Sequence, residues 1–508
     1  MKGPLINMSK IIIGIAAGNH DASISVIKNN KLVYAGHSER YSKIKNDKYL
    51  NEEIIEDALS YIDSPVDTIC FYERPWLKKS RQLYAGQYKS FFTNFYYKKC
   101  IKTLKNRLNN VPKIKYVRHH KAHAAHAYLS PFDEAIVLVV DSIGEWDTIS
   151  FWLYRDNDLI LLESIKYPFS LGLFYTAFTQ YVGLKPNEDE YILMGMSAFG
   201  NLESVDYFID KFNFNLINYE KMYNYNFHKG VRVSLNEFSS VDIAAAVQFL
   251  LEKMLCKLAS RVEYYQNMYK VDNLVYSGGV ALNCVANSNV FLKNFSNNLF
   301  IFPNPGDSGT STGAALVENK QRINFDSIYL GYSMKNLDTD AVDSIVDYIL
   351  KNRIVGLAHG RAEFGPRALG NRSLLADPRF KSIKDEVNKI KQREKFRPFA
   401  PVILEEKFSE YFETLGLKSS PYMQYTLKCK YPELFPSIIH VDNTSRVQTV
   451  NKNQNEFLYL LLSKFYEKTG CPMLLNTSLN IKGMPILNDI SDVKQFESLY
   501  GVKIFYAT

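Results

Sequence analysis

The first part of the chain carries a pattern of apolar and polar residues that is typical of short strands. Residues 11–17 are apolar, residues 22–26 alternate between apolar and polar, and residues 32–35 are again largely apolar. Polar turns separate the three segments. We therefore predict a three-strand meander, and we interpret residues 11–17 as its first strand rather than as the core of a secretion signal.

The same pattern returns roughly 125 residues further along the chain. Residues 135–140 are apolar, residues 141–145 are small or polar, and an alternating run at 148–154 is followed, after an Asp-Asn-Asp turn, by residues 159–165. Two such copies indicate a duplicated α/β unit whose polar turns face each other across a cleft. Helical periodicity fills the intervals, over residues 52–62, 92–108, 171–182 and 241–268.

Two later turns combine glycine with small polar residues. An expected strand at 273–276 runs into residues 277–283, with a helix expected from about residue 285. Backbone amides at such a turn can approach a phosphate, and the helix N-terminus adds the positive end of its dipole, although Gly-Gly turns are more often structural. The second turn, at 303–309, precedes an alanine-rich helix that we expect from about residue 312.

The pattern weakens around residues 330–340, and a new strand-loop-helix series begins at residue 354. We therefore predict two domains, over residues 1–340 and 341–508. A chain of 508 residues is long enough for two to four packed units. With 46% hydrophobic and 22% charged residues, it is neither a disordered nor a fibrous protein.

The cysteines, the apolar runs and the net charge limit the kinds of partner and the cellular compartment that we expect. The six cysteines are far apart and form no Cys-x-x-Cys pair, so we expect them to be reduced and buried in a cytoplasmic protein. No apolar run reaches the roughly 18 residues of a membrane helix, so we expect no membrane partner. The net charge of +8 is spread thinly, which favours anionic small ligands over a nucleic-acid groove but also fits an ordinary surface.

Four of the nine histidines fall within residues 119–126. On a helix, His119 and His123 project from the same face, as chelation of one metal ion requires, and His120 can replace one of them. Asp141 and Asp307, each at a strand end or in a loop before a helix, are the carboxylates that we add. Two imidazoles with oxygen ligands suit Fe²⁺, with Mn²⁺ or Zn²⁺ as alternatives. The competing interpretation is a solvated, histidine-rich helix start.

His20 and Asp21 lie in the first turn and open onto the same expected cleft. A histidine with a pKa near neutrality can take a proton from a hydroxyl nucleophile. A turn histidine that bonds to its own backbone explains the residue equally well.

The second domain carries arginines that alternate with glycine and proline. Residues 360–373 contain Arg361, Arg367 and Arg372, and residues 393–399 contain Arg393 and Arg397. Guanidinium groups on such loops suit bidentate capture of phosphates from several directions. An RNA-binding patch or a surface salt-bridge network is the alternative, but stacking aromatic residues are few here.

Eight motifs occur in the order found in nodulation-protein-type O-carbamoyltransferases, and the chain resembles this family over nearly its whole length. They are residues 18–23, 119–123, 141–145, 277–283, 360–373, 393–398, 440–442 and 476–480. More distantly, the first domain resembles threonylcarbamoyl-tRNA transferases and the second resembles YrdC-type carbamoyl-adenylate synthases.

The resemblance implies a fold and a two-step reaction. The fold would be α/β, with a duplicated actin-like (ASKHA) N-terminal domain and a smaller YrdC-like α/β C-terminal domain. The C-terminal domain would bind carbamoyl phosphate and ATP, form carbamoyl adenylate, and release phosphate and pyrophosphate. The N-terminal domain would then transfer the carbamoyl group to a hydroxyl of a small-molecule acceptor, such as a sugar, a nucleoside or a natural product.

The resemblance also implies roles for individual residues. His20, Arg367 and Arg397 would be catalytic, and a metal ion held by the His119, His123, Asp141 and Asp307 group would orient the intermediate. The residues expected to hold the nucleotide and phosphate groups are Ser277, Gly278, Gly279, Asn283, Arg361, Arg372, Arg393, Asn476, Thr477 and Ser478.

The sequence departs from the family pattern at four positions. Ser142 and Asn443 stand where glycine is usual, Ile192 where lysine is common, and Met484 where glutamate is common. The changes at Ile192 and Met484 each remove a charge near an expected pocket, which puts the choice of substrate in doubt more than the type of reaction.

Two other functions are compatible with parts of the sequence. A tRNA-modifying transferase would need a continuous basic face, whereas the positive residues cluster in loops of one domain, so we expect no nucleic-acid partner. A nucleotide sensor without catalysis would bind nucleotide without releasing pyrophosphate. The aromatic segment at residues 91–97 is a candidate interface of a homodimer.

Overall fold

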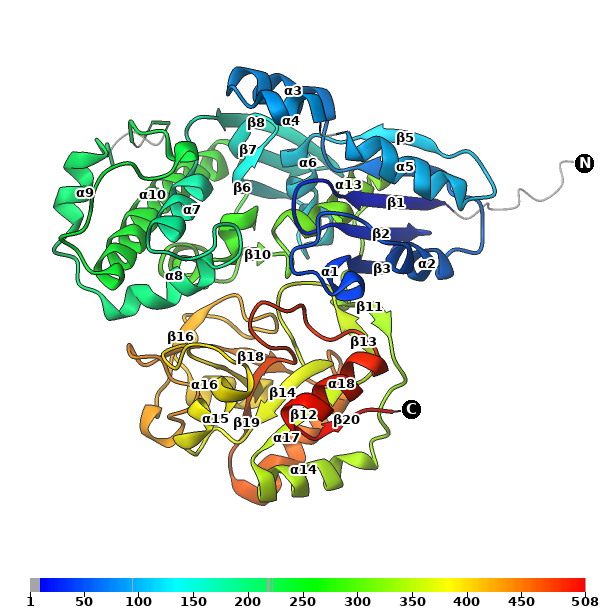
Figure 1. Ribbon diagram of the computed structural model, residues 1–508, viewed down its shortest axis with the longest axis vertical. Coiled ribbons are helices and arrows are strands. Elements are labelled where there is room, and N and C mark those ends of the chain that lie inside the picture. Colours follow the sequence, from blue (N-terminus) through cyan, green and yellow to red (C-terminus); the bar gives the residue numbers. More distant parts are fainter. Residues whose placement is uncertain (1–9, 94, 217–219, 222, 508) are drawn as a thin grey trace, which may run out of the picture.

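Two five-stranded sheets of the same topology form the first part of the fold. The computed structural model describes residues 10–507 apart from 94, 217–219 and 222, and Figure 1 shows the sheets side by side in its upper half. The first sheet has the order β3-β2-β1-β4-β5, in which β1 to β3 form an antiparallel meander and β4 and β5 continue in parallel. Its strands are β1 (Ile11–Ala16), β2 (Ser23–Lys28), β3 (Lys31–His37), β4 (Thr68–Phe71) and β5 (Lys113–Tyr116).

The second sheet repeats this arrangement. Its order is β8-β7-β6-β9-β10, again an antiparallel meander followed by two parallel strands. Its strands are β6 (Ala135–Gly144), β7 (Asp147–Arg155), β8 (Asp158–Lys166), β9 (Leu274–Ser277) and β10 (Leu299–Ile301). The duplicated α/β unit predicted from the sequence is therefore confirmed. Strand β6 is longer than expected, because it continues past residue 140 with an irregular register and carries Asp141 inside the strand.

Helices α6 and α13 lie at the centre of this half of the molecule (Figure 1). Helix α13 packs against α6 so closely that a Cβ on Gly313 would lie 1.8 Å from the carbonyl oxygen of Ala122. A side chain at this position would therefore separate the two helices. The expected helix at 92–108 is divided into α4 and α5, whereas those expected at 171–182 and 241–268 are present as α7 and α10.

The helices before residue 330 cover these two sheets, and α7 to α10 form a helical layer at the left of Figure 1. They are α1 (Glu39–Ser42), α2 (Glu52–Ser60), α3 (Pro75–Tyr84), α4 (Tyr88–Thr93), α5 (Tyr96–Asn106), α6 (His119–Ala124), α7 (Leu171–Tyr181), α8 (Glu190–Met196), α9 (Val205–Lys211), α10 (Ser240–Tyr269), α11 (Cys284–Ala286), α12 (Lys293–Phe295) and α13 (Thr310–Asn319).

A mixed six-stranded sheet forms the lower half of Figure 1. Its order is β18-β15-β19-β14-β12-β20, with strands β12 (Ile354–Ala358), β14 (Arg372–Ala376), β15 (Ala400–Leu404), β18 (Gln448–Val450), β19 (Met473–Ser478) and β20 (Ile504–Phe505). Two short pairs accompany it, β11 (Tyr329–Ser333) with β13 (Arg361–Glu363) and β16 (Thr426–Lys428) with β17 (Thr444–Arg446). Its helices are α14 (Ala341–Asn352), α15 (Ser382–Ile390), α16 (Phe408–Tyr411), α17 (Glu456–Thr469) and α18 (Ile490–Tyr500).

The fold class is thus α/β, with a duplicated unit followed by a smaller α/β unit, as expected. The strand-loop-helix series expected from residue 354 is wrong in one respect, because β12, β13 and β14 all precede helix α15. One hydrophobic core continues from the second sheet into the six-stranded sheet, for example from Ile136 to Val402, and a second core surrounds the first sheet.

All six cysteines are free thiols, as expected. Five of them are buried, but Cys256 is exposed on helix α10, so the expectation that every cysteine is buried is wrong. Within the described part of the chain, no helix combines the length and the apolar character that crossing a membrane requires.

Candidate active site

A single cavity of about 1260 Å³ is lined by residues from both halves of the molecule. His20, Asp141 and Asp307 of the first half line it, together with Arg367 and other basic residues of the second half. The sequence predicted two pockets, one basic and one centred on a cation. The structure instead places residues of both along one cavity.

The predicted metal ligands meet in a buried cluster. His119 and His123 come from α6, Asp141 from β6, and Asp307 from a 3-10 turn (Asp307–Gly309) before α13. The Nε2 atoms of the two histidines are 3.1 Å apart. The Nε2 atom of His119 lies 3.3 Å from Asp141 Oδ2 and 3.4 Å from Asp307 Oδ1, and the corresponding distances for His123 are 4.0 and 3.5 Å.

This donor set fits a divalent cation. Bonds of about 2.0–2.2 Å from one ion place neighbouring ligand atoms roughly 3–4 Å apart, which is the range of the distances above. All four residues are buried, and one ligand atom from each lies within 4.8 Å of the others. Burial raises the pKa of both carboxyl groups, but the adjacent imidazoles outweigh it and hold each pKa below its ordinary value. The carboxylates are therefore ionised, as metal ligands must be.

Close packing behind the cluster depends on glycine. A Cβ on Gly144 would lie 2.2 Å from Cδ2 of His119, so any side chain at this position would displace the imidazole. Gly144 ends strand β6, and this places the strand against helix α6.

The other two histidines of the motif point elsewhere. His120 bonds through Nδ1 to Ser150 Oγ at 2.7 Å, so the structure does not bring this alternative ligand to the cluster. His126 bonds to Ser277 Oγ at 2.9 Å and to the Gly309 carbonyl at 3.0 Å. Burial lowers the pKa of both imidazoles, that of His126 to about 3, so both remain neutral and connect elements of the core.

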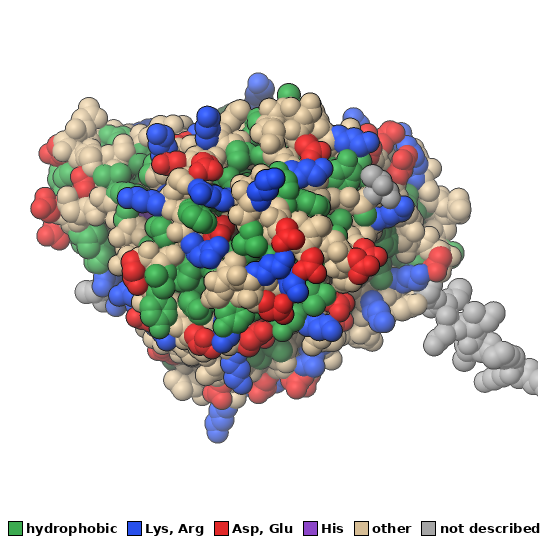
Figure 2. All heavy atoms as spheres, turned by 90° about the horizontal axis from the view of Figure 1, so that it is seen from below, with side chains coloured by type: hydrophobic (Ala, Val, Ile, Leu, Met, Phe, Trp, Pro, Cys, Tyr) green, Lys and Arg blue, Asp and Glu red, His purple; other side chains and the backbone are tan. Residues whose placement is uncertain are grey.

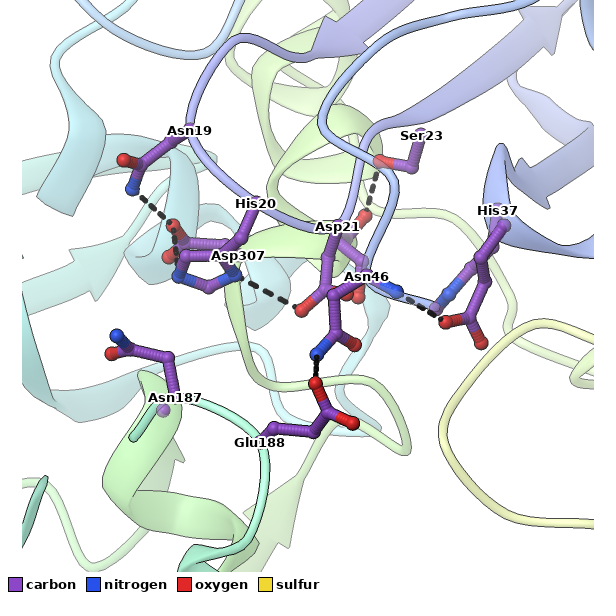
Figure 3. A network of polar contacts seen from close by, with 12 residues as sticks. Asn19, His20, Asp21, Ser23, His37, Asn46, Asn187, Glu188 and Asp307 are labelled. Carbon is purple, nitrogen blue, oxygen red and sulfur yellow. Dashed lines mark hydrogen bonds and ion pairs between the residues drawn. The ribbon is translucent and has the colours of Figure 1, made fainter. Parts of the chain in front are cut away.

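His20 lies beside the cluster, between two carboxylates (Figure 3). Its Nδ1 atom is 3.0 Å from Asp21 Oδ2, and its Nε2 atom is 3.5 Å from Asp307 Oδ2. Desolvation lowers the pKa of His20, but Asp307 and Asp21 outweigh this effect and raise the pKa to about 9. The ring is partly exposed to the cavity, so it can exchange a proton with a bound molecule.

Three of the predicted arginines line the cavity from the second half. Arg393 donates from Nε to Asn388 Oδ1 at 2.7 Å, and Nη1 of Arg397 lies 3.3 Å from Glu394 Oε2. Arg367 has no hydrogen-bond or ion-pair partner among the described residues. The guanidinium of Arg397 also lies 4.7 Å from the ring centre of Tyr191, which belongs to the first half. Arg367 and Arg393 therefore bring to the cavity positive charge that forms no ion pair among the described residues.

Other predicted residues also line the cavity. They are Gly279 and Asn283 after strand β9, and Asn476, Thr477 and Ser478 at the end of strand β19. Gly279 donates its backbone N–H to Asp141 Oδ1 at 3.0 Å, so the glycine turn also contacts the carboxylate cluster.

Six of the predicted residues do not line the cavity. Two of them, His119 and His123, belong to the buried cluster, and the other four are Arg361, Arg372, Ser277 and Gly278. Arg372 is fully buried and donates to backbone carbonyls, among them His359 at 2.7 Å and Asn488 at 3.1 Å. Arg361 is likewise occupied by carbonyls of strands β3 and β11. Because backbone carbonyl oxygens already accept hydrogen bonds from both guanidinium groups, these groups link separate segments of the chain and are not available to a ligand.

Ser277 and Gly278 also lie outside the cavity lining. Ser277 is engaged by His126, and Gly278, with φ of +97°, packs so that a Cβ would be 2.2 Å from the Val140 carbonyl oxygen. Their role in the described structure is to allow strand β9 to turn beneath the cluster.

Several basic residues that were not predicted from the sequence also line the cavity, and two of them, Lys391 and Arg446, lie beside the predicted arginines. Lys391 is almost fully buried, and its Nζ atom lies 3.1 Å from Ser478 Oγ and 2.9 Å from Asn480 Oδ1. Burial, Arg393 and Arg397 lower the pKa of Lys391. Arg446 lies close enough to Arg367 to lower the pKa of that residue. The spacing of Lys391 two residues before Arg393 was the available signal, whereas no pattern marked Arg446.

The departures from the family pattern also have structural consequences. Asn443 has φ of +61°, a region that favours glycine and that asparagine tolerates better than most residues. Ile192 is buried in the cavity wall, whereas Met484 is exposed at its lining, and Ser142 lines the cavity as well. Three of the four departures thus change the surface that a substrate contacts.

Two family models match most of the chain, and relatives of similar length match it as well. Residues 11–316 match the family model described as the carbamoyltransferase N-terminus, and residues 346–506 match the carbamoyltransferase C-terminus. The chain is 33% identical to an uncharacterized protein of Synechocystis sp., over 94% of this chain and 92% of that protein. It is 30% identical to nodulation protein NolO of Bradyrhizobium diazoefficiens, over 72% of each chain. It is 27% identical to 3'-hydroxymethylcephem-O-carbamoyltransferase of Amycolatopsis lactamdurans, over 97% of each chain.

Among solved structures, T. kodakarensis HypF matches with a TM-score of 0.35 and 15% identity, over 62% of this chain and 48% of that chain.

Proposed function

The chain belongs to the carbamoyltransferase family, and on that premise we propose that it makes carbamoyl adenylate from carbamoyl phosphate and ATP and transfers the carbamoyl group to a hydroxyl of a small molecule. The observation that carries this proposal is the cavity that is lined both by Arg367 and Arg393 and by Asp141 and Asp307, the two carboxylates of the buried His/Asp cluster. We also propose the domain boundary near residue 340, which lies between the two matched segments.

The first step belongs to the basic part of the cavity. Carbamoyl phosphate and water give carbamate and phosphate, and a carbamate oxygen then attacks the α-phosphorus of ATP while the bond to pyrophosphate breaks. Both reactants are polyanions, and Arg367, Arg393 and Arg397 supply the positive charge that binds them and stabilises the charge that develops. Lys391, which holds Ser478 and Asn480 in place, keeps the end of strand β19 ordered beside them.

The second step belongs to the histidine-aspartate part of the cavity. The acceptor oxygen attacks the carbamoyl carbon, the carbon–oxygen bond to AMP breaks, and His20 takes the proton of the hydroxyl. A divalent cation held by the His119, His123, Asp141 and Asp307 group would polarise the carbamoyl carbonyl and, by offsetting the charge of Asp307, lower the pKa of His20. We propose Fe²⁺ for this site, with Mn²⁺ or Zn²⁺ as alternatives.

Joining the two steps in one cavity has a chemical benefit. Carbamoyl adenylate is an activated acyl compound that water can hydrolyse. A path from the arginines to His20 within one cavity shortens its exposure to bulk solvent. A nucleotide sensor would need no such path, so the shared cavity favours the two-step enzyme.

A small acceptor also fits the surface better than tRNA does. On the face shown in Figure 2, Lys and Arg side chains are interspersed with Asp and Glu and form no continuous basic stripe. Arg367 and Arg393, which form no ion pair among the described residues, lie inside the cavity instead. We therefore place sugars, nucleosides and natural products before nucleic acid as candidate acceptors.

The test combines two readouts on the purified full-length protein with ATP, carbamoyl phosphate and Fe²⁺. We expect pyrophosphate release that depends on carbamoyl phosphate, and carbamoylated products when a panel of small hydroxyl compounds is screened by mass spectrometry. Nucleotide binding without any pyrophosphate release would contradict the proposal and support the sensor.

A further inference from the structure

Neither proposed step uses the part of the cavity that is lined by the end of helix α3. Arg81 and Gln82 line it from α3, Gln87 follows the helix, and His228 comes from the segment between α9 and α10. Arg81 is only 7% exposed, and its guanidinium makes no hydrogen bond or ion pair with the described residues. Gln82 is 4% exposed, and its Oε1 atom is buried without a partner in the same part of the structure.

At this part of the cavity wall, Arg81 carries a positive charge that no carboxylate among the described residues pairs. Lys229, the other cation near His228, is exposed and does not line the cavity. Glu73 is the nearby carboxylate, but both of its oxygens are bound by Lys78 Nζ, at 3.0 and 3.1 Å. Glu73 and Lys78 therefore neutralise each other. Burial, Arg81 and Lys229 lower the pKa of His228, so its imidazole adds no charge at neutral pH.

Contacts within the protein fix the positions of Arg81 and Gln82 before any ligand binds. Lys79 Nζ donates to the carbonyl oxygen of Ser90 at 2.7 Å, which ties α3 to α4. Gln87 donates its backbone N–H to the Gln82 carbonyl at 2.8 Å, and its Nε2 atom lies 3.1 Å from Nε2 of His228. The wall therefore presents a preorganised guanidinium and amide rather than a flexible surface arginine.

A buried guanidinium without an acceptor is costly, since it has lost the hydrogen bonds of water without gaining others in the protein. An oxyanion that reaches Arg81 removes this cost and gains charge-assisted hydrogen bonds. A single excess positive charge matches a monoanion, such as a carboxylate, better than the dianion of a phosphate monoester. His20 lines the same cavity, so an acceptor long enough to span the distance from Arg81 would present its hydroxyl group there.

We infer that the acceptor of the carbamoyl group is a hydroxyl compound that also carries a carboxylate, which binds to Arg81 with the help of Gln82. This inference rests on the proposed function and adds the chemical class of the acceptor. In this role Arg81 is a specificity-determining residue that takes no part in making carbamoyl adenylate.

The experiment compares matched pairs of alcohols that differ only in charge, namely glucuronate with glucuronamide and 4-(hydroxymethyl)benzoate with 4-(hydroxymethyl)benzamide, with glucose 6-phosphate as a dianion. The full-length protein receives ATP, carbamoyl phosphate and Fe²⁺, and carbamoylated products are quantified by mass spectrometry. We expect each acid that reacts to exceed its amide by at least tenfold. We expect Arg81→Gln to reduce this ratio to near one and Arg81→Lys to give an intermediate ratio.

The outcomes separate this inference from the proposed function. Without pyrophosphate release by the wild-type protein, the proposed function fails. With pyrophosphate release, the inference is overturned if amides react as well as acids, if glucose 6-phosphate is the preferred acceptor, or if no acid reacts. Arg107→Gln, a change in a surface ion pair, serves as the arginine control, and the melting temperature of each variant reports its folding. The wild-type preference for acids over amides tests the carboxylate class of the acceptor even if an Arg81 variant does not fold.

Discussion

Replacing Arg367 by alanine tests the assignment of the first step. Arg367 lines the cavity and has no partner among the described residues, so its guanidinium is free to bind a phosphate group of a substrate. A hydrogen bond to a charged group contributes about 1.5–3 kcal/mol, so a bidentate contact contributes about 3–6 kcal/mol. At about 1.4 kcal/mol per tenfold change, Arg367→Ala should slow carbamoyl-phosphate-dependent pyrophosphate release by roughly 10² to 10⁴-fold.

The same substitution should not destabilise the free protein. Burial and the neighbouring Arg446 both lower the pKa of Arg367, which means that its charged form is disfavoured where it lies. Removing the guanidinium relieves this repulsion and leaves no buried carboxylate unpaired. We expect the melting temperature without substrates to stay the same or to rise.

The assay is the rate of pyrophosphate release at saturating ATP with varied carbamoyl phosphate. Arg353→Ala is the matched control in the same domain, because Arg353 is exposed and its guanidinium lies over the ring of Phe380, 4.1 Å from its centre. We expect this control to release pyrophosphate within about twofold of the wild type, as is usual for surface changes. A folded Arg367→Ala protein whose rate falls by less than tenfold would refute the assignment.

Three further predictions concern the second step. His119→Ala or His123→Ala should lower the amount of bound metal, measured by elemental analysis. Either change should also slow carbamoyl transfer by at least about 100-fold while pyrophosphate release persists. Full metal occupancy in the double variant would contradict the assignment of the two histidines as ligands. Gly144→Ala should produce the same loss of metal without removing a ligand, because its Cβ would overlap the imidazole of His119, and unchanged metal content would contradict the packing argument. Asp21→Asn removes a carboxylate that raises the pKa of His20, so the neutral imidazole should become available at lower pH. The acid limb of the pH profile of the transfer rate should therefore move down by about one pH unit. An unshifted limb would exclude His20 as the titrating base.

Features that depend on residues close together in the sequence could be predicted from it. The two meanders follow from alternating strands with polar turns, and the pairing of His119 with His123 follows from the helical repeat. Asp141 and Asp307 could be placed because polar residues that end buried segments of a duplicated fold converge at one cleft.

Features that depend on distant partners could not be predicted in this way. Arg372 and Arg367 look alike in the sequence, but carbonyl oxygens from several segments saturate Arg372, whereas Arg367 faces open space. His120 and His126 share the motif with the metal cluster, yet serines on neighbouring strands take their ring nitrogens. Arg81 carries no motif at all, and its significance is visible only from its burial and its lack of a partner.

We propose that carbamoyl adenylate passes from the arginines to His20 inside one cavity. Mixing the Arg367→Ala protein with the His123→Ala protein tests it, because the first lacks synthesis and the second lacks transfer. If the intermediate stays inside the cavity, the mixture should make carbamoylated product at less than about a tenth of the wild-type rate, since transfer between molecules loses the high effective concentration of an internal path. Recovery of most of the wild-type rate, with each variant inactive alone, would contradict the claim and show that the intermediate travels through solution.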